Sequence, residues 1–294
     1  MPTAYINGTD LYYEKRGDGF PIIFIHPPLL TSANFRYQQV QLAGQFTVIT
    51  FDIRGHGRSG TSEAPVTYEL IVEDMLRLLD HLKLPEAFVC GYSTGGSIAL
   101  EALLTHPDRF TGGILVSAMS EVSDFVLRNR IRVAVGMSRW KPLIRVLMWG
   151  ITWGNADGRQ TFRNLLRDAR RGNPANIHQY YRFSLTYSCT KRLAGLRAPV
   201  LLLYGNKDGG FTLYRKKIQS MLPHYDLHIL ENEKHQIPTK AASEMNDVIG
   251  KWIRGLQRPR EKAATGRPAE LEAGIGTPPY AALPEEPAEQ QPEA

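Results

Sequence analysis

The stretch FVCGYSTGGSIAL, residues 88–100, places one serine between glycines where an apolar run meets a segment with helical spacing. The residues before Ser93 have the length and composition of a buried strand, and the pattern after it stops at Pro107, as expected just past the end of a helix. The stretch therefore predicts a strand, a tight turn and a helix. It leaves open whether Ser93 is a nucleophile or a small residue that the turn requires.

The rest of the chain repeats this alternation of apolar runs and helical patterns. Asn7-Gly8 predicts an N-terminal hairpin, and a helix is expected over 67–84 from the spacing of its leucines. Further strands are expected at 21–26, 46–52, 87–92, 112–118, 199–206 and 225–230, and a final helix at 241–253. Alternating strands and helices predict an α/β fold with a doubly wound, mostly parallel sheet.

About seventy residues separate the expected strands at 112–118 and 199–206, far more than a crossover in such a sheet needs. They are dense in Arg, Trp and Met and carry no clear strand signal, so we expect an inserted helical cap. Our predicted domain bounds are 1–118 and 197–256 for the α/β core, 119–196 for the cap, and 257–294 for a disordered tail rich in Pro, Glu and Ala.

Composition narrows the class of protein. The formal net charge is +6, and the basic residues gather between Arg128 and Arg171, but no nucleic-acid motif accompanies them, so we expect a solvated basic face and no nucleic-acid partner. Cys90 and Cys189 are too few for a disulfide framework. The first twenty residues lack the layout of a secretory signal and no run is long enough to span a bilayer, which predicts a cytoplasmic protein.

Chemistry at Ser93 needs partners elsewhere in the chain. A serine hydroxyl is a weak nucleophile until a base takes its proton, and a carboxylate should fix the tautomer of that base. His235, in the loop between the last strand and the final helix, is the candidate base. Asp208 directly follows a buried strand, where catalytic groups collect in open α/β sheets, and is the favoured acid. Glu121 and Asp124 remain alternative acids.

Six segments together resemble the α/β-hydrolase fold, in its lid-bearing esterase-like and epoxide-hydrolase-like group. They are IFIHPPLLTSANF (23–35), FDIRGHGRSG (51–60), GYSTGG (91–96), HPDRF (106–110), LLLYGNKD (201–208) and EKHQIP (233–238). The resemblance implies a catalytic triad of Ser93, Asp208 and His235 without cofactor or metal. Relatives with alkyl-enzyme chemistry use an aspartate at the elbow, so the serine favours acyl transfer to water. The resemblance also implies that a loop beside the site is shaped by Asp52, Arg54, Gly55, Gly57 and Ser59.

One departure from the family concerns the oxyanion hole. The resemblance implies a His-Gly start to the loop and a backbone N–H from the next position, but here the sequence is His26-Pro27-Pro28-Leu29, and proline has no N–H. Thr94 supplies one N–H donor, and we expect the Leu29 N–H to supply the second. Alternatively, the Thr31 or Ser32 hydroxyl is the second donor, or the second donor is missing and the protein is a weak catalyst. Candidate substrate-binding residues are His26, Tyr92, Trp140 and Trp149.

These observations predict a serine hydrolase for a carboxylic ester or lactone with an apolar acyl part. Carbon–carbon bond hydrolysis and cofactor-free perhydrolysis use the same triad and remain alternatives. A slow-turnover ligand receptor or signalling protein is an alternative from another class. The expected partner is a small molecule, and contact of the cap with a membrane surface is kept as a less favoured hypothesis.

Overall fold

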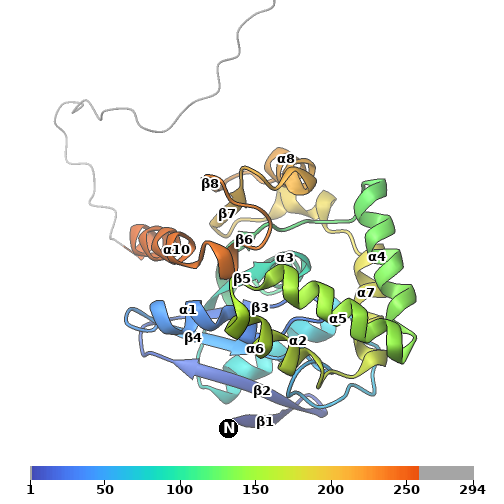
Figure 1. Ribbon diagram of the computed structural model, residues 1–294. Helices are drawn as coiled ribbons and strands as arrows, with labels where there is room; N and C mark the ends of the chain where they lie inside the picture. Colours follow the sequence, from blue (N-terminus) through green and yellow to red (C-terminus); the bar gives the residue numbers. More distant parts are fainter. Residues whose placement is uncertain (1, 258–294) are drawn as a thin grey trace, which may run out of the picture. The chain divides into compact units, whose positions relative to one another are not determined.

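The computed structural model describes residues 2–257, and these contain an eight-stranded sheet in the order β1-β2-β4-β3-β5-β6-β7-β8. The strands are β1 (Thr3–Ile6), β2 (Thr9–Arg16), β3 (Phe20–Ile25), β4 (Phe46–Phe51), β5 (Ala87–Tyr92), β6 (Phe110–Val116), β7 (Val200–Gly205) and β8 (Asp226–Leu230). β1 and β2 run antiparallel at one edge, and the pairs from β4 to β8 are parallel. The predicted doubly wound, mostly parallel sheet is confirmed (Figure 1).

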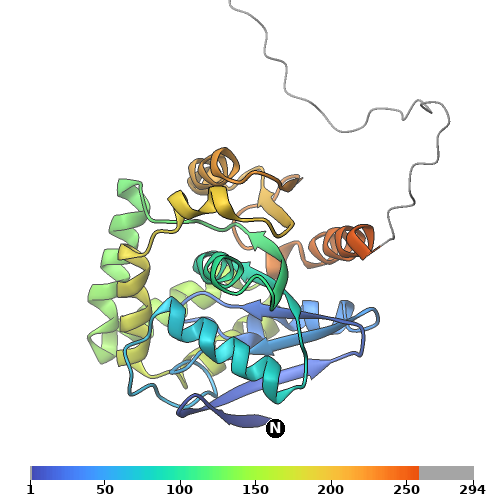
Figure 2. The ribbon, with the colours of Figure 1, turned by 180° about the vertical axis from the view of Figure 1, so that it is seen from behind.

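Helices cover both faces of this sheet. The core-flanking helices are α1 (Arg36–Gln41), α2 (Tyr68–His81), α3 (Thr94–Thr105), α8 (Thr212–Met221), α9 (Ile237–Lys240) and α10 (Ala242–Gln257), and short 3-10 turns are η1 (Ser32–Phe35), η2 (Thr190–Gly195) and η3 (Gly209–Phe211). Figure 2 shows the face of the sheet that is covered by α2 and α3, which lie nearest the viewer. Among these helices, α1, α8 and the short α9 were not predicted from the apolar pattern.

Alternation along the parallel strands explains this sandwich. In β3, Ile23 and Ile25 join the apolar cluster under α2 and α3, whereas Ile22 and Phe24 join the cluster under α10. A parallel strand buried on both sides has no polar face, and this is why the strand stretches read as nearly continuous apolar runs. The hairpin turn follows its sequence signal, since Asn7 and Gly8 both have positive φ.

Four helices fill the segment between β6 and β7. They are α4 (Phe125–Ser138), α5 (Lys141–Asn155), α6 (Arg159–Ala169) and α7 (Pro174–Thr186). In Figure 1 α5 and α6 lie in front of the sheet and α4 and α7 beside it. The predicted tail lies outside the described residues, apart from Gln257.

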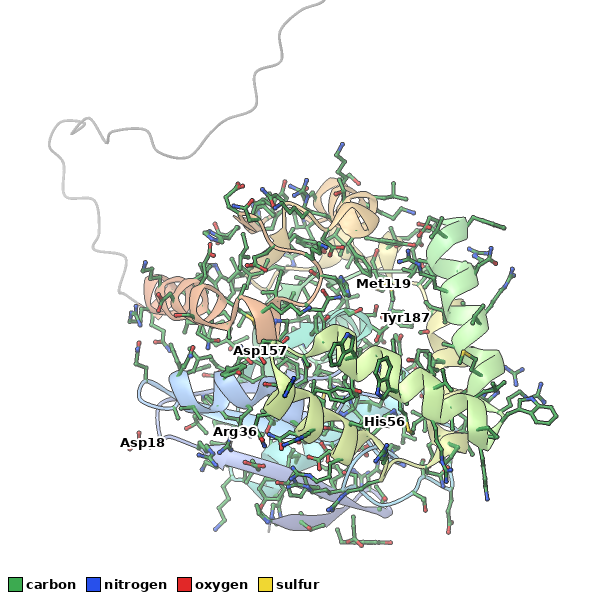
Figure 3. All side chains as sticks on the ribbon, in the orientation of Figure 1. Asp18, Arg36, His56, Met119, Asp157 and Tyr187 are labelled. Carbon is green, nitrogen blue, oxygen red and sulfur yellow. The ribbon has the colours of Figure 1, made fainter. Side chains whose placement is uncertain are left out.

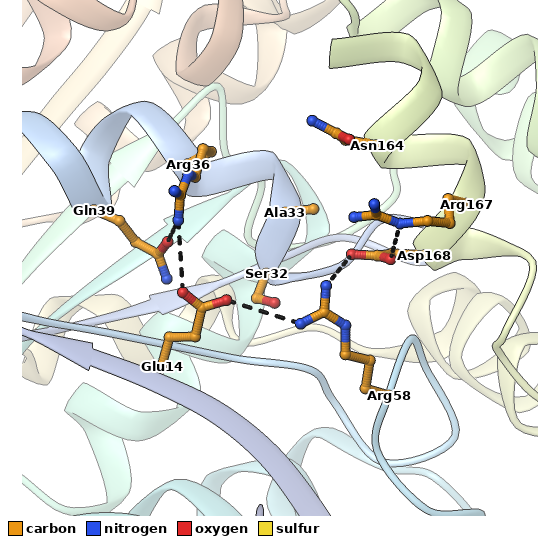
Figure 4. Close-up of a pocket in the computed structure, with 9 residues that line it drawn as sticks. All are labelled: Glu14, Ser32, Ala33, Arg36, Gln39, Arg58, Asn164, Arg167 and Asp168. Carbon is orange, nitrogen blue, oxygen red and sulfur yellow. Dashed lines mark hydrogen bonds and ion pairs between the residues drawn. The ribbon is translucent and has the colours of Figure 1, made fainter. Parts of the chain in front are cut away.

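A charged junction joins α6 to the core. Around a hollow of about 230 Å³, Arg58 lies 3.1 Å from Asp168 and Arg167 lies 3.0 Å from the same carboxylate. Figure 4 shows that Arg36 and Arg58 also form ion pairs with Glu14 on β2. Because each of these arginines pairs with a carboxylate, the ion pairs around the hollow connect α6 with β2 and α1.

Within residues 2–257 no helix has the length and apolarity needed to cross a membrane.

Candidate active site

Ser93 sits in the strained turn that the sequence indicates. It follows β5 and precedes α3, and its φ of 55° and ψ of −120° lie in a backbone region that residues other than glycine rarely adopt. Two glycines make the turn possible. A Cβ at Gly91 would lie 2.2 Å from the Gly95 carbonyl oxygen, and one at Gly95 would lie 2.3 Å from the Ile25 oxygen. The strand, the turn and the helix therefore pack with no space for side chains between them.

The structure brings Ser93, His235 and Asp208 together from three separate loops. His235 Nε2 lies 3.1 Å from Ser93 Oγ, and His235 Nδ1 lies 2.9 Å from Asp208 Oδ2. Asp208 follows β7 and is buried, and the His235 ring packs on the Phe211 ring with centroids 4.1 Å apart. The three side chains form one continuous chain of hydrogen bonds.

The alternative acids are engaged elsewhere. Asp124 caps α4 by accepting the Leu127 N–H at 2.9 Å and also accepts the Tyr214 hydroxyl. Glu121 accepts hydrogen bonds from Lys217, and also from Ser188 and Thr190, and these contacts lower the pKa of its carboxyl to about 2. Neither carboxylate contacts His235, so the geometry favours Asp208.

Behind the loop that follows β3 lies a buried pair of histidines. His26 is fully buried, its Nε2 accepts the Ile53 N–H at 2.9 Å, and its Nδ1 lies 3.0 Å from the Pro27 oxygen. Burial, with His56 nearby, lowers the pKa of His26 to about 3, and burial lowers that of His56 to about 4. Both rings are therefore neutral near pH 7. They hold the loop and do not reach the substrate space.

The loop itself turns sharply at the two prolines. Pro28 is followed by Leu29 at φ 67°, and a proline followed by a positive-φ residue is the pattern of a type II turn, where glycine is usual. The Leu29 side chain is buried in the core. Asp52 holds the chain just beyond, accepting the Ser32 N–H at 2.8 Å and the Arg58 N–H at 2.8 Å. Thr94, the first residue of α3, has an N–H that its own helix does not use.

A cavity of about 770 Å³ opens at Ser93 and His235. Pro27, Pro28 and Leu30 form its wall on the side of the β3 loop, and Met119, which follows β6 and is labelled in Figure 3, also lines the cavity. Most of the remaining wall comes from the inserted helices. The lining residues there are Phe125, Val126, Leu127, Asn129, Arg130, Ile131, Val133 and Ala134 on α4, Leu147, Ile151 and Asn155 on α5, and Tyr181 on α7. The cavity is thus mainly apolar next to the Ser-His pair.

The candidate substrate-binding residues separate into two groups. Tyr92 lines the cavity and donates its hydroxyl to Asn155 at 2.9 Å, which ties the end of β5 to α5. His26, Trp140 and Trp149 are not among the lining residues, so the structure does not bring these three predicted substrate-binding residues to the cavity. His26 is sealed in the core, and Trp140 and Trp149 point to solvent. The α4 residues that take their place carry no pattern that distinguishes a cavity wall from an ordinary helix face.

Comparison with known proteins agrees with this fold. The family model described as alpha/beta hydrolase fold matches residues 21–238. The chain is 28% identical over 216 residues to a putative carbamate hydrolase RutD of Azorhizobium caulinodans, covering 71% of this chain and 81% of that protein. It is 30% identical over 105 residues to 3-oxoadipate enol-lactonase 2 of Acinetobacter baylyi, covering 35% of this chain and 39% of the relative.

Solved structures match over most of the chain. The enol-lactonase from Burkholderia xenovorans superimposes with a TM-score of 0.76 at 18% identity, covering 86% of this chain and 100% of that one. An esterase from Exiguobacterium antarcticum gives a TM-score of 0.77 at 18% identity, covering 86% and 98%. At these identities the likeness shows the fold alone.

Proposed function

The chain belongs to the α/β-hydrolase fold family, and on that premise we propose that it is a serine hydrolase that cleaves a carboxylic ester or lactone with an apolar acyl part. The observation that carries this proposal is the hydrogen-bonded chain of Ser93, His235 and Asp208 at the end of the apolar cavity. Its order in the sequence, serine then aspartate then histidine, is the order found with a nucleophile elbow.

In the proposed first half-reaction, Ser93 Oγ attacks the carbonyl carbon while His235 Nε2 takes the hydroxyl proton. The new C–O bond forms as the carbonyl becomes an oxyanion. His235 then gives its proton to the leaving alkoxide as the bond from the carbonyl carbon to the leaving oxygen breaks, and an acyl-Ser93 ester remains. The Nδ1 proton stays on His235 throughout, and the Asp208 carboxylate accepts the hydrogen bond from that N–H.

Water completes the cycle in the second half-reaction. His235 removes a proton from the water, whose oxygen attacks the acyl carbon, and the proton returns to Ser93 Oγ as the acid leaves. We assign the oxyanion donors to the N–H groups of Thr94 and Leu29. The α3 N-terminus favours the negative charge that develops beside Thr94.

The substrate class follows from the cavity. Its wall is supplied mainly by apolar side chains of α4 and α5, so burial of an alkyl or aryl portion stabilises binding by about 0.8 kcal/mol for each methylene. We propose that the helices α4–α7 act as the cap that forms this wall. The named relatives act, by their names, on a carbamate and an enol-lactone, and both reactions open a carbonyl derivative of the kind proposed here.

A second candidate function rests on Pro27-Pro28. Loss of one oxyanion donor costs about a hundred- to a thousandfold in rate, so a chain in which Leu29 does not replace the missing N–H would bind a ligand and turn it over slowly. A slow-turnover receptor is therefore the alternative, and it differs from the enzyme in rate.

The test is labelling by a fluorophosphonate followed by intact mass, with ester hydrolysis measured on chains of increasing acyl length. We expect one adduct per chain within minutes, absent in Ser93→Ala and strongly reduced in His235→Ala. Labelling of the folded protein that is slow while ligand binding persists supports the receptor. Labelling that survives Ser93→Ala contradicts the assignment of the nucleophile.

A further inference from the structure

Helix α5 carries apolar side chains on two opposite faces. Ile144, Met148 and Thr152 are buried against the protein, as expected for the inner side of a surface helix. The outer side is also apolar, because the exposed stripe at helical spacing is Leu143, Val146, Trp149 and Trp153. A surface helix usually presents polar groups there, so this outer stripe needs a reason outside the folding of the chain.

The aromatic side chains on this side are exposed to solvent and pack against one another. The rings of Trp149 and Trp153 stack with centroids 5.6 Å apart and planes 3° apart, and Phe162 of α6 meets both edge-on. These two tryptophans are 51% and 55% exposed, and Trp140, just before α5, is 66% exposed. Three of the four tryptophans of the chain thus lie on α5 or directly before it, and the fourth, Trp252, lies on α10.

The segment of sequence that carries the stripe is positively charged. Between Asp124 and Asp157 the sequence holds no acidic residue, whereas its basic residues are Arg128, Arg130, Arg132, Arg139, Lys141 and Arg145. Asp157 itself accepts the Tyr37 hydroxyl at 2.5 Å. Exposed tryptophan and aliphatic side chains beside arginine and lysine are the composition of helices that lie in the headgroup region of anionic bilayers.

We propose that this aromatic–basic face, consisting of Trp140, Leu143, Val146, Trp149 and Trp153 with Arg139, Lys141 and Arg145, binds the surface of bilayers that contain anionic lipids. The tryptophan rings enter the interface, and the basic side chains extend their apolar stems along it and reach the lipid phosphates. A second copy of the chain is a poorer occupant, because a symmetric pair would bring the same positive face against itself.

Helix α4 packs against α5 and also lines the cavity. The neighbouring helix α4 exposes Phe125, Val126 and Val133, and the same three residues line the space that leads to Ser93. A bilayer on the aromatic–basic face therefore lies near an apolar entrance. The binding itself does not depend on catalysis, so the surface proposal and the proposed function can fail separately.

The experiment uses the full chain with vesicles of phosphatidylcholine alone and of equal parts phosphatidylcholine and phosphatidylglycerol, at low and high salt. Tryptophan emission and co-sedimentation are measured together, and emission reports mainly on this face because three of the four tryptophans lie on it. We expect a blue shift and co-sedimentation with the anionic vesicles at low salt, weakened by salt. Trp149→Ser with Trp153→Ser, and separately Arg145→Glu, should each weaken binding at least about tenfold.

The matched control is Lys251→Glu, which makes the same charge change on the exposed side of α10 and should leave binding within about twofold of the wild type. Ser93→Ala should bind vesicles as the wild type does. Absence of binding at low salt, or equal loss in the α10 control, overturns the proposal. A dimer in sedimentation velocity that the double tryptophan substitution dissolves, without vesicle binding, assigns the face to self-association instead.

Discussion

Replacement of Asp208 by asparagine tests the assignment of the acid most directly. The asparagine has nearly the same shape in a buried position, and the Ser93 and His235 side chains are themselves unchanged. The substitution acts at the 2.9 Å contact with Nδ1, where an amide N–H in place of a carboxylate oxygen favours the wrong imidazole tautomer. It also removes the negative charge that stabilises the imidazolium formed when Ser93 attacks.

The two effects together should lower kcat by about a thousand- to ten-thousandfold, equivalent to about 4 to 5.5 kcal/mol in the activation free energy. KM should change little, because Asp208 is not among the residues that line the cavity. The assay is steady-state hydrolysis of a chromogenic ester of medium acyl length, with the unfolding midpoint measured on the same samples.

The control is Asp124→Asn, which changes the rival carboxylate in the same way. Because asparagine caps a helix about as well as aspartate, this substitution should change stability by less than about 1 kcal/mol and leave kcat within tenfold of the wild type. The reasoning is refuted if Asp208→Asn keeps kcat within tenfold, or if the Asp124 variant shows the larger loss in a protein that is still folded.

Three further outcomes follow from the geometry. His26 and His56 have pKa values of about 3 and 4 in the folded protein, whereas histidine in an unfolded chain titrates near 6.5, so the unfolded chain binds more protons below pH 6.5. The free energy of unfolding should therefore fall by about 2 kcal/mol per histidine from pH 7 to pH 5. Urea titrations measure this fall, and His56→Phe should make it smaller. Asp74→Asn leaves Arg54, now 2.6 Å from Asp74 and almost fully buried, without its counter-charge, and should lower stability by about 3 to 5 kcal/mol in the same titration; a loss below 1 kcal/mol contradicts this. Ile151→Trp fills part of the cavity and should lower kcat/KM for an octanoyl ester relative to an acetyl ester by about tenfold, the loss of roughly two buried methylenes; an unchanged ratio places the acyl chain elsewhere.

The local signals in the sequence were strong wherever backbone geometry had only one solution. The elbow at Ser93 was predictable because a strand, a turn with two glycines and a helix must follow one another within a few residues. His235 and Asp208 were predictable as candidates because both follow strands whose carboxyl ends share one edge of the sheet. Their mutual distances came from the structure.

The cavity wall was beyond reach of the sequence for a physical reason. Helix α5 is apolar nearly all round, so periodicity does not say which of its faces turns inward. Trp149, one of its largest side chains, was predicted to bind substrate, yet Ile151 two positions further on faces the cavity. In the same way, the positive φ of Leu29 has no local signature, because a glycine or asparagine is the usual sign of such a turn.

The contacts at Gly91 and Gly95 have a consequence for the adaptability of this protein. The serine is located by the backbones of β5, α3 and β3 in direct contact, and no side chain lies between them. We therefore expect replacement of cavity side chains to change what the cavity can accommodate while the Ser93 backbone keeps its position. Under the proposed function, the position of the nucleophile and the choice of substrate would be encoded in separate sets of residues, and each could vary while the other is kept.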